Sequence, residues 1–330
     1  MRAIVCKSWG EPAEVLQLDE VEPPRCGPGQ VRVRMLASPI NPSDLFLVRG
    51  LYGYLPSLPC TPGFEGVGIV EEGHGLLAWR VKGRRVAVLN GAGGNWADQV
   101  VIPARAAVPI PDSLSDEQAA TFFVNPATAI VLTRYVLPLR RGDWLLQTAA
   151  GSALGRMVIR LGKKYGFRTI NIVRRQEQAD ELRRLGADAV IVYPGEDVPA
   201  RVRELTEGKG ATHAIDAVCG ETGAQCLAAL APRGRLILYS SLSLKPLPVD
   251  PRLLMNADRR VEGFWLSTWV KQQNPLRMLG LFRQIAALIR EGVADTQIGQ
   301  TFSLEQIRQA VTLAGTPGRQ GKVLLRINAR

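Results

Sequence analysis

The sequence lacks any long apolar run. Although 46% of its 330 residues are hydrophobic, no stretch approaches the roughly 20 apolar residues that a membrane-spanning helix needs. The segment from Met1 to Gly10 also lacks the apolar centre of a secretory signal peptide. These absences exclude an integral membrane protein of the helical class, and we expect a soluble, cytoplasmic protein with no membrane partner.

Cysteine and histidine are scarce. There are two histidines, His74 and His213, and five widely spaced cysteines: Cys6, Cys26, Cys60, Cys219 and Cys226. The odd number and wide spacing of the cysteines argue against a disulfide framework and for reduced thiols. With no Cys-x-x-Cys pair, a tetrahedral zinc site would need ligands from unconnected parts of the chain, so we expect no metal site.

Acidic residues are outnumbered, 30 against 41 lysines and arginines, which gives a formal net charge of +11. Such a charge attracts polyanions, including nucleic acids. The basic residues are scattered, however, with only short clusters such as Arg183-Arg184 and no basic stripe interleaved with aromatic residues. We expect no nucleic-acid partner and a basic surface that suits phosphate-bearing cofactors and substrates.

Helical periodicity is missing from the first third of the chain. Prolines recur at positions 23, 24, 28, 39, 42, 56, 59 and 62 and exclude long helices there. Short apolar or alternating runs instead predict strands at Val31–Leu36, Val67–Val70, Arg85–Leu89 and Ala97–Ile102. We expect a compact β-rich domain.

A helix-start pattern at Ser115 and Gln118 opens an apolar run that Pro126 interrupts. From Asp143 onward, strand and helix patterns alternate. Strands are predicted at Trp144–Gln147, Thr169–Val173, Ala189–Val192, His213–Val218, Arg235–Tyr239 and Val261–Leu266. Helices are predicted near 152–165, 176–185, 197–206, 221–231 and 251–257. This rhythm predicts an α/β fold with a doubly wound parallel sheet.

The last sixty residues are predicted to form helices near Pro275–Glu291 and Ser303–Thr312 and a strand at Gly321–Ile327. Since the parallel sheet is complete before them, they return most simply to the first domain. A chain of this length fits two domains. We therefore predict a β-rich domain, residues 1–120 and 268–330, and a domain built on the parallel sheet, residues 121–267.

Small residues gather where the first parallel strand meets its helix, from Ala149 to Gly155. Such a turn lets backbone amides and a helix N-terminus hold a pyrophosphate. The glycine fingerprint is imperfect, because Ala150 and Ser152 stand where glycines are expected. A purely structural turn remains the alternative, but within the six-strand alternation we favour dinucleotide binding.

The second parallel strand ends in Arg174-Arg175-Gln176, with no acidic residue before Glu177. NAD-binding sheets place an Asp or Glu there for the ribose hydroxyls, whereas two guanidiniums suit a 2′-phosphate. The alternative is that these arginines cap an exposed helix. We favour NADPH.

The stretch from Ile40 to Gly68 combines an Asn-Pro turn, an isolated Tyr52 between Gly50 and Gly53, and four prolines. Such a rigid, punctuated loop suits the presentation of side chains. It predicts the reactive part of an active site.

Taken together, these features resemble the medium-chain dehydrogenase/reductase superfamily over essentially the whole chain, with a GroES-like β-rich domain and a Rossmann domain. Where its zinc branch carries a ligand cysteine and a Gly-His-Glu segment, this chain has Asn41 and Gly63-Phe64-Glu65. The resemblance therefore implies a zinc-independent enzyme. The segments that look most like the 2-enoyl thioester reductases are INPSD (40–44), LYGYLPSLP (51–59), VNPATA (124–129), TINIVR (169–174) and GFWLSTW (263–269).

This resemblance implies NADPH-dependent reduction of the C2=C3 bond of a trans-2-enoyl thioester, carried by coenzyme A or acyl-carrier protein. Tyr52 corresponds to the family's proton donor, and Asn41 is the supporting choice. A plain turn former remains the alternative for Asn41, and an amphipathic rim residue for Tyr52. Two functional alternatives stay open. One is an NADPH:quinone oxidoreductase or general reductase of activated alkenes, and the other is a cofactor-binding protein with a nucleic-acid or regulatory role.

Carried over residue by residue, the family's cofactor contacts fall on Asn125, Gly151, Ser152, Ala153, Leu154, Arg174, Arg175, Gln176, Tyr239, Ser240, Ser241, Leu242, Phe264, Trp265, Leu266 and Lys322. The family often has arginine at the position of Gln176, and an apolar wall is the alternative for Phe264 and Trp265. The superfamily also commonly pairs through its sixth parallel strand. We therefore expect a homodimer through Val261–Leu266, an edge that needs covering.

Overall fold

The computed structural model describes residues 1–329 and divides into two compact units. Unit 1 combines residues 1–124 with residues 279–329, and unit 2 runs from Asn125 to Met278. The Rossmann domain predicted from the sequence, residues 121–267, can be compared with unit 2. The two units are described separately below.

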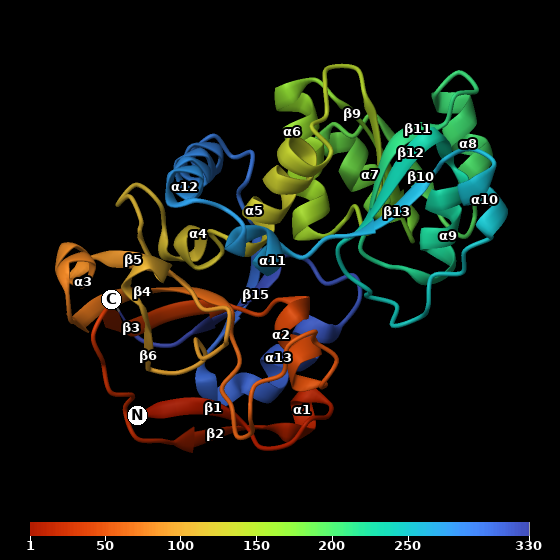
Figure 1. The fold of residues 1–330 in the computed structure, drawn as a ribbon. Coiled ribbons are helices and arrows are strands. Elements are labelled where there is room, and N and C mark those ends of the chain that lie inside the picture. The colour runs from red at the N-terminus through yellow and green to blue at the C-terminus, as the bar shows by residue number, and fades with distance from the viewer. Residues whose placement is uncertain (330) are drawn as a thin grey trace. The chain divides into compact units, whose positions relative to one another are not determined.

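Unit 2 holds a six-stranded sheet in the order β10-β9-β8-β11-β12-β13, in which every neighbouring pair is parallel. Its strands are β8 (Trp144–Gln147), β9 (Arg168–Val173), β10 (Ala189–Val192), β11 (Ala211–Asp216), β12 (Leu230–Leu238) and β13 (Arg260–Gly263). Its helices are α5 (Val124–Val131, starting in unit 1), a π-helical turn (Leu132–Val136), α6 (Ala153–Tyr165), α7 (Gln176–Leu185), α8 (Val198–Leu205), α9 (Gly220–Ala228), α10 (Pro251–Met255) and α11 (Leu266–Lys271). The strand order reverses between β8 and β11, which is the switch point where doubly wound sheets bind ligands. The predicted α/β class is confirmed (Figure 1).

Local sequence explains where these helices begin and end. Helix α6 starts at Ser152, whose hydroxyl accepts a hydrogen bond from the amide of Gly155 at 3.1 Å. It ends at Gly166, and α7 ends at Gly186, both in the left-handed conformation that glycine adopts without strain. The cap at Ser152 fixes the end of the turn that follows β8, and the two glycines end the helices that precede β9 and β10.

Unit 1 is built on a seven-stranded sheet in the order β14-β15-β3-β4-β5-β7, with β6 pairing with β3. Its strands are β3 (Gln30–Pro39), β4 (Glu65–Gly73), β5 (Arg85–Leu89), β6 (Gln99–Pro103), β7 (Ala107–Pro109), β14 (Ile298–Phe302) and β15 (Lys322–Arg326), and a separate pair is β1 (Arg2–Cys6) with β2 (Leu16–Glu20). Strand β15 pairs antiparallel with β3, so the end of the chain returns to the N-terminal strands as predicted (Figure 1, blue against red).

The helices of unit 1 are mostly short: α1 (Pro12–Val15), α2 (Pro42–Val48), α3 (Leu76–Val81), α4 (Asp116–Ala120), part of α12 (Pro275–Arg290) and α13 (Ile307–Gly315), with 3-10 turns at Ala104–Ala106 and Leu304–Gln306. Helix α4 opens with the predicted capping box between Ser115 and Gln118. No helix among residues 1–329 is both long and apolar enough to cross a membrane.

The sixth parallel strand is shorter than predicted. The sequence pattern extended it from Val261 to Leu266, but β13 ends at Gly263 and Leu266 begins α11. Leu266, Trp269 and Val270 have the spacing of neighbours on one face of a helix. This helical spacing explains why the apolar run, which predicted a strand, continues as α11. The amide of Phe264 still bonds to the carbonyl of Leu238 at 2.8 Å, which extends the pairing by one residue.

Gly155 is the position where the turn after β8 leaves no room for a side chain. A Cβ at this position would lie 2.5 Å from the carbonyl oxygen of Ala150 and 2.6 Å from its Cα, both backbone atoms. We predict that Gly155→Ala destabilises the protein by about 1–3 kcal/mol, the usual range for overpacking. The measurement is calorimetric unfolding.

The matched control is Gly280→Ala, also within a helix, where a Cβ meets nothing within 4 Å. Alanine there is expected to stabilise by about 0.5–1 kcal/mol, because glycine is a poor helix former. Equal effects of the two substitutions would contradict the close approach inferred at Gly155.

Candidate active site

The loop predicted to be reactive is anchored at the start of α2. Asn41 is the N-cap and Pro42 is the first helical residue. The carboxylate of Asp44 accepts a hydrogen bond from the backbone amide of Asn41 at 2.7 Å. The other oxygen of Asp44 accepts one from the amide of Phe64 at 3.0 Å. One buried carboxylate therefore joins the start of α2 to the residue before β4.

Behind this anchor lies a network of buried polar side chains. Asn41, Asp44, Glu65 and Lys322 are each at most 4% exposed. The side-chain amide of Asn41 donates to Glu65 Oε1 at 2.9 Å, and its oxygen accepts a hydrogen bond from the Lys322 ammonium. Glu65 Oε2 accepts from the amides of Phe123 and Val124 at 3.2 and 2.8 Å. Asn41 thus links an acid on β4 to a base on β15.

The ionisable groups of this network have shifted pKa values. Burial raises the pKa of Asp44 to about 7, with Glu65 adding to the effect, while hydrogen bonds from the amides of Asn41 and Phe64 oppose it. Burial likewise raises the pKa of Glu65, against the charge of Lys322. Burial lowers the pKa of Lys322 to about 8, and Glu65 opposes this shift. Burial therefore brings the pKa values of Asp44 and Lys322 closer to neutral pH than those of the free side chains.

Tyr52 lies on the loop that this network anchors. Its ring packs against that of Phe64 with centroids 4.8 Å apart and planes tilted by 32°. Tyr52 is half-buried, whereas Tyr54, two residues further on, is 62% exposed. Three contacts connect the predicted donor to the predicted supporting residue. The ring of Tyr52 packs on Phe64, and Asp44 accepts hydrogen bonds from the backbone amides of both Phe64 and Asn41.

These residues do not fit a zinc ion. Catalytic zinc takes Cys, His and carboxylate ligands and keeps one position open. Here the carboxylates of Asp44 and Glu65 already accept hydrogen bonds from N–H groups, and Lys322 places a cation beside Asn41. Asn41 and Phe64 contribute neither a thiolate nor an imidazole.

In unit 2, the residues predicted to hold a pyrophosphate lie in the turn between β8 and α6. Ala149 adopts a φ of 48°, Gly151 and Ser152 follow, and Ala153 begins the helix. The side chain of Leu154 is buried, so its backbone is what the turn presents. The backbone amides at this helix N-terminus suit an anionic group.

Arg174, Arg175 and Gln176 are exposed and follow β9, as predicted. The side chain of Gln176 donates to Asp180 at 3.0 Å, and Arg175 is the N-cap of α7. Two guanidiniums thus stand at the carboxyl edge of the sheet, and the acid that follows them, Glu177, lies in the first turn of the helix.

A buried pair at the switch point was missed from the sequence. Thr148, after β8, donates to Asp216 at 2.5 Å, and the carboxylate of Asp216 also accepts from the amides of Val218 and Cys219 at 2.8 and 3.0 Å. An acid inside an apolar strand pattern was the available signal. This carboxylate fixes the turn after β11.

The predicted loop residues Tyr239, Ser240, Ser241 and Leu242 lie beside that turn. The amide of Tyr239 bonds to the Asp216 carbonyl at 3.0 Å, and that of Leu242 to the Ala217 carbonyl at 2.9 Å. The other predicted residues of unit 2 are Asn125, the second residue of α5, Phe264, after β13, Trp265, the N-cap of α11, and Leu266, its first residue. Lys322 lies in unit 1, in the buried network.

Two family models match the chain. That of the alcohol dehydrogenase GroES-like domain matches residues 27–112, and that of zinc-binding dehydrogenase matches residues 153–282. The mitochondrial enoyl-[acyl-carrier-protein] reductase of Rattus norvegicus is 32% identical over 321 residues, which cover 96% of this chain and 86% of that protein.

Solved structures of quinone oxidoreductases have the same fold. That of Pseudomonas syringae is 28% identical with a TM-score of 0.90, covering 98% of this chain and 99% of the other. That of Escherichia coli, in complex with NADPH, is 26% identical with a TM-score of 0.90, covering 99% of this chain and all of the other. With its parallel sheet, its β-rich unit and a relative matched over nearly the whole length, this chain belongs to the medium-chain dehydrogenase/reductase superfamily of oxidoreductases.

Proposed function

We propose that this oxidoreductase reduces the C2=C3 double bond of a trans-2-enoyl thioester with NADPH, without a zinc ion. The observation that carries the proposal is the half-buried Tyr52, packed on Phe64 above a buried network that contains no metal-ligand set of thiolates or imidazoles. A relative whose name is enoyl-[acyl-carrier-protein] reductase, 32% identical over 96% of the chain, supports the choice of substrate class.

When bound, NADPH would supply the hydride that adds to Cβ of the substrate, and NADP⁺ would be the other product. The residues of this chain then have two tasks, which are to stabilise the negative charge on the thioester oxygen and to provide a proton for Cα. The phenol of Tyr52 suits both, because it donates a hydrogen bond to an oxyanion and passes on a proton.

Asn41 acts in this proposal as a positioning residue. Asn41 is 2% exposed, and its carboxamide forms hydrogen bonds with Glu65 and Lys322. Its backbone amide donates a hydrogen bond to Asp44. Asp44 also holds Phe64, on which Tyr52 packs. Asn41 therefore fixes the loop that carries the donor. Lys322 reaches the same network and helps to hold its charge balance.

Unit 2 would bind the cofactor through residues that follow β8, β9 and β12. The backbone amides of Gly151 to Leu154 suit the pyrophosphate, and Arg174 with Arg175 suits a 2′-phosphate. Tyr239 to Leu242, which follow β12, lie at the same carboxyl edge of the sheet. The net charge of +11 suits coenzyme A and acidic acyl-carrier protein alike.

A second candidate is reduction of quinones or other activated alkenes. It is favoured by the structural similarity to quinone oxidoreductases, one of them in complex with NADPH. The cofactor and the donor would be the same, and only the substrate would differ.

A cofactor and substrate panel distinguishes these candidates. We predict that NADPH oxidation is faster with crotonyl-CoA than with a naphthoquinone or a simple enone. Replacing NADPH by NADH should lower kcat/KM roughly 10- to 100-fold, since charge-assisted hydrogen bonds are worth about 1.5–3 kcal/mol. The double variant Arg174→Ala/Arg175→Ala should lose this preference. A higher kcat/KM on the quinone would overturn the enoyl thioester assignment, and equal use of NADH would overturn the NADPH assignment.

Replacement of the donor is the test of mechanism. We predict that Tyr52→Phe lowers kcat on crotonyl-CoA by about 10² to 10⁴, the usual contribution of a positioned acid. Thermal unfolding should be nearly unchanged, because the ring and its contact with Phe64 remain.

The matched control is Tyr54→Phe, which removes a hydroxyl from the same loop at a more exposed position. It should keep kcat close to that of the original protein. An unchanged kcat in Tyr52→Phe, or an equal loss of kcat in both variants, would contradict the assignment of Tyr52 as the proton donor.

We also propose that the chain forms a homodimer through β13. This strand is an edge of the parallel sheet and pairs only with β12 among the described residues. An unpaired edge is a template for a second strand, and twofold pairing covers it. Light scattering at micromolar concentration should give twice the mass of one chain. A monomer at that concentration would contradict the proposal.

A further inference from the structure

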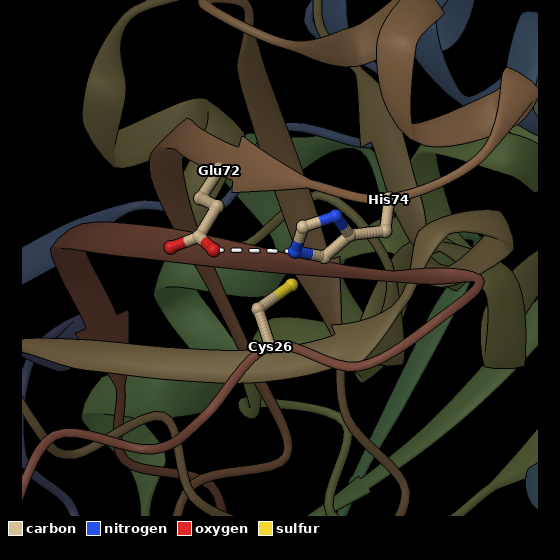
Figure 2. A group of neighbouring side chains, drawn as sticks. All are labelled: Cys26, Glu72 and His74. Atoms are coloured by element: carbon tan, nitrogen blue, oxygen red, sulfur yellow. Dashed lines mark hydrogen bonds and ion pairs between the residues drawn. The ribbon is translucent and has the colours of Figure 1, made fainter.

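Three potential metal ligands meet at the surface of unit 1. Figure 2 shows the thiol of Cys26, the carboxylate of Glu72 and the imidazole of His74 turned toward one another. One ligand atom from each lies within 4.8 Å of the others, and His74 Nε2 is 3.2 Å from Glu72 Oε1. This is the only such group of three Cys, His, Asp or Glu side chains in the part of the chain that the structure describes.

Backbone pairing holds the three residues in place. Glu72 and His74 are two positions apart at the end of β4, so their side chains leave the strand on the same side. The carbonyl of His74 accepts a hydrogen bond from the Gly29 amide at 2.9 Å, and its amide donates to the Gln30 carbonyl at 3.1 Å. The segment before β3 is thereby fixed against the end of β4. This places the thiol of Cys26 close to the side chains of Glu72 and His74.

The connection from Cys26 to β3 is further restrained. The Gln30 side chain accepts a hydrogen bond from the Gly27 amide at 2.9 Å, and Pro28 forms a bridge with His74. Cys26 is half-buried in this turn, while His74 is exposed. The ligands are therefore organised by the fold, and the histidine side remains open to an incoming ion.

The donor set is that of a zinc site with three protein ligands. Zinc binds thiolate, imidazole and carboxylate and takes water in the fourth position. Thiolate and imidazole ligands favour it over magnesium or calcium, which prefer oxygen. Metal–ligand distances of about 2.0–2.3 Å place tetrahedral ligands roughly 3.3–3.8 Å apart. A separation of at most 4.8 Å thus leaves about 1–1.5 Å to be closed by side-chain rotation.

The second oxygen of Glu72 has a partner of its own. Arg32, its pairing neighbour on β3, approaches Oε2 at 2.8 Å, whereas Oε1 faces His74. Such an outer contact orients a ligating carboxylate and leaves one oxygen for the ion. The charges of one thiolate and one carboxylate would then offset that of a divalent cation, while the contact with Arg32 holds the carboxylate in place.

We propose that Cys26, Glu72 and His74 bind one Zn²⁺ ion, which clips the segment before β3 to the end of β4. Glu72 lies seven residues along β4 from Glu65, roughly 23 Å at the rise of a strand. The site therefore shares no residue with the network around Asn41, and it does not depend on the proposed enoyl reductase activity.

The test is metal binding by the untagged, full-length protein. After treatment with a chelator, titration with Zn²⁺ against a chromophoric competitor should give one equivalent of binding. Titration with Co²⁺ should give an absorption band of thiolate-to-metal charge transfer and the visible bands of a tetrahedral ion. Loss of an outer partner commonly weakens a metal site 10- to 100-fold, so Cys26→Ser and His74→Asn should each weaken Zn²⁺ binding by at least about 100-fold.

The matched controls are His213→Asn, at the only other histidine, and Cys60→Ser, at another partly exposed cysteine. Both should keep one equivalent of Zn²⁺ and the charge-transfer band. Circular dichroism of the metal-free variants checks that each is folded. The proposal is overturned if the folded original protein binds less than one equivalent, or if Cys26→Ser and His74→Asn bind as tightly as the controls.

Discussion

The burial of charge behind α2 is the constraint on which unit 1 depends. Asp44, Glu65 and Lys322 are removed from water, at a cost of several kcal/mol for each ionised group. Hydrogen bonds and the attraction between Lys322 and the two acids offset that cost, and Asn41 supplies or receives three of the hydrogen bonds. The residues at the centre of the network therefore cannot move independently. The loop with Tyr52 takes its position from the same set, because Asp44 holds both Asn41 and Phe64.

This arrangement is the basis for our proposal that the site works without zinc, although one matching family model is that of zinc-binding dehydrogenase. A zinc ion would concentrate positive charge at one point, whereas here the positive charge is an ammonium on β15, and Asn41 relays it to a carboxylate on β4. The carboxylates of Asp44 and Glu65 accept hydrogen bonds from N–H groups, which makes them poor candidates for metal ligands. Any polarisation of a substrate oxygen is left to a hydrogen-bond donor, for which Tyr52 is our proposal.

Much of unit 2 could be predicted because its signals are local. The strands at Trp144–Gln147 and Ala189–Val192 have the predicted bounds, since buried parallel strands are apolar runs that turn residues interrupt. The capping box at Ser115 likewise needs only four consecutive residues. The same local signals failed at Leu266, where an apolar run has both a strand and a helix interpretation and only the tertiary structure decides. Asp216 was missed because its role depends on Thr148, 68 residues earlier.

The sites of unit 1 were harder to predict because their partners are far apart in sequence. The sequence suggested Asn41 and Tyr52 singly, but the pairing of Asn41 with Glu65 and Lys322 depends on the register of β3 with β4 and β15. Cys26 and His74 appeared unconnected for the same reason, and it is the backbone pairing of the segment before β3 that joins them.

The hydrogen bond between Lys322 and Asn41 spans 281 residues, and the whole of unit 2 lies between them. During synthesis, the N-terminal strands leave the ribosome long before β15 does. Until β15 pairs with β3, Glu65 and Asn41 have no cation and their burial is unfavourable. The parallel sheet of unit 2 can fold in this interval, whereas the network around Asn41 must wait. We therefore expect the network around Asn41, and with it the position of the Tyr52 loop, to form only after β15 has joined the sheet of unit 1.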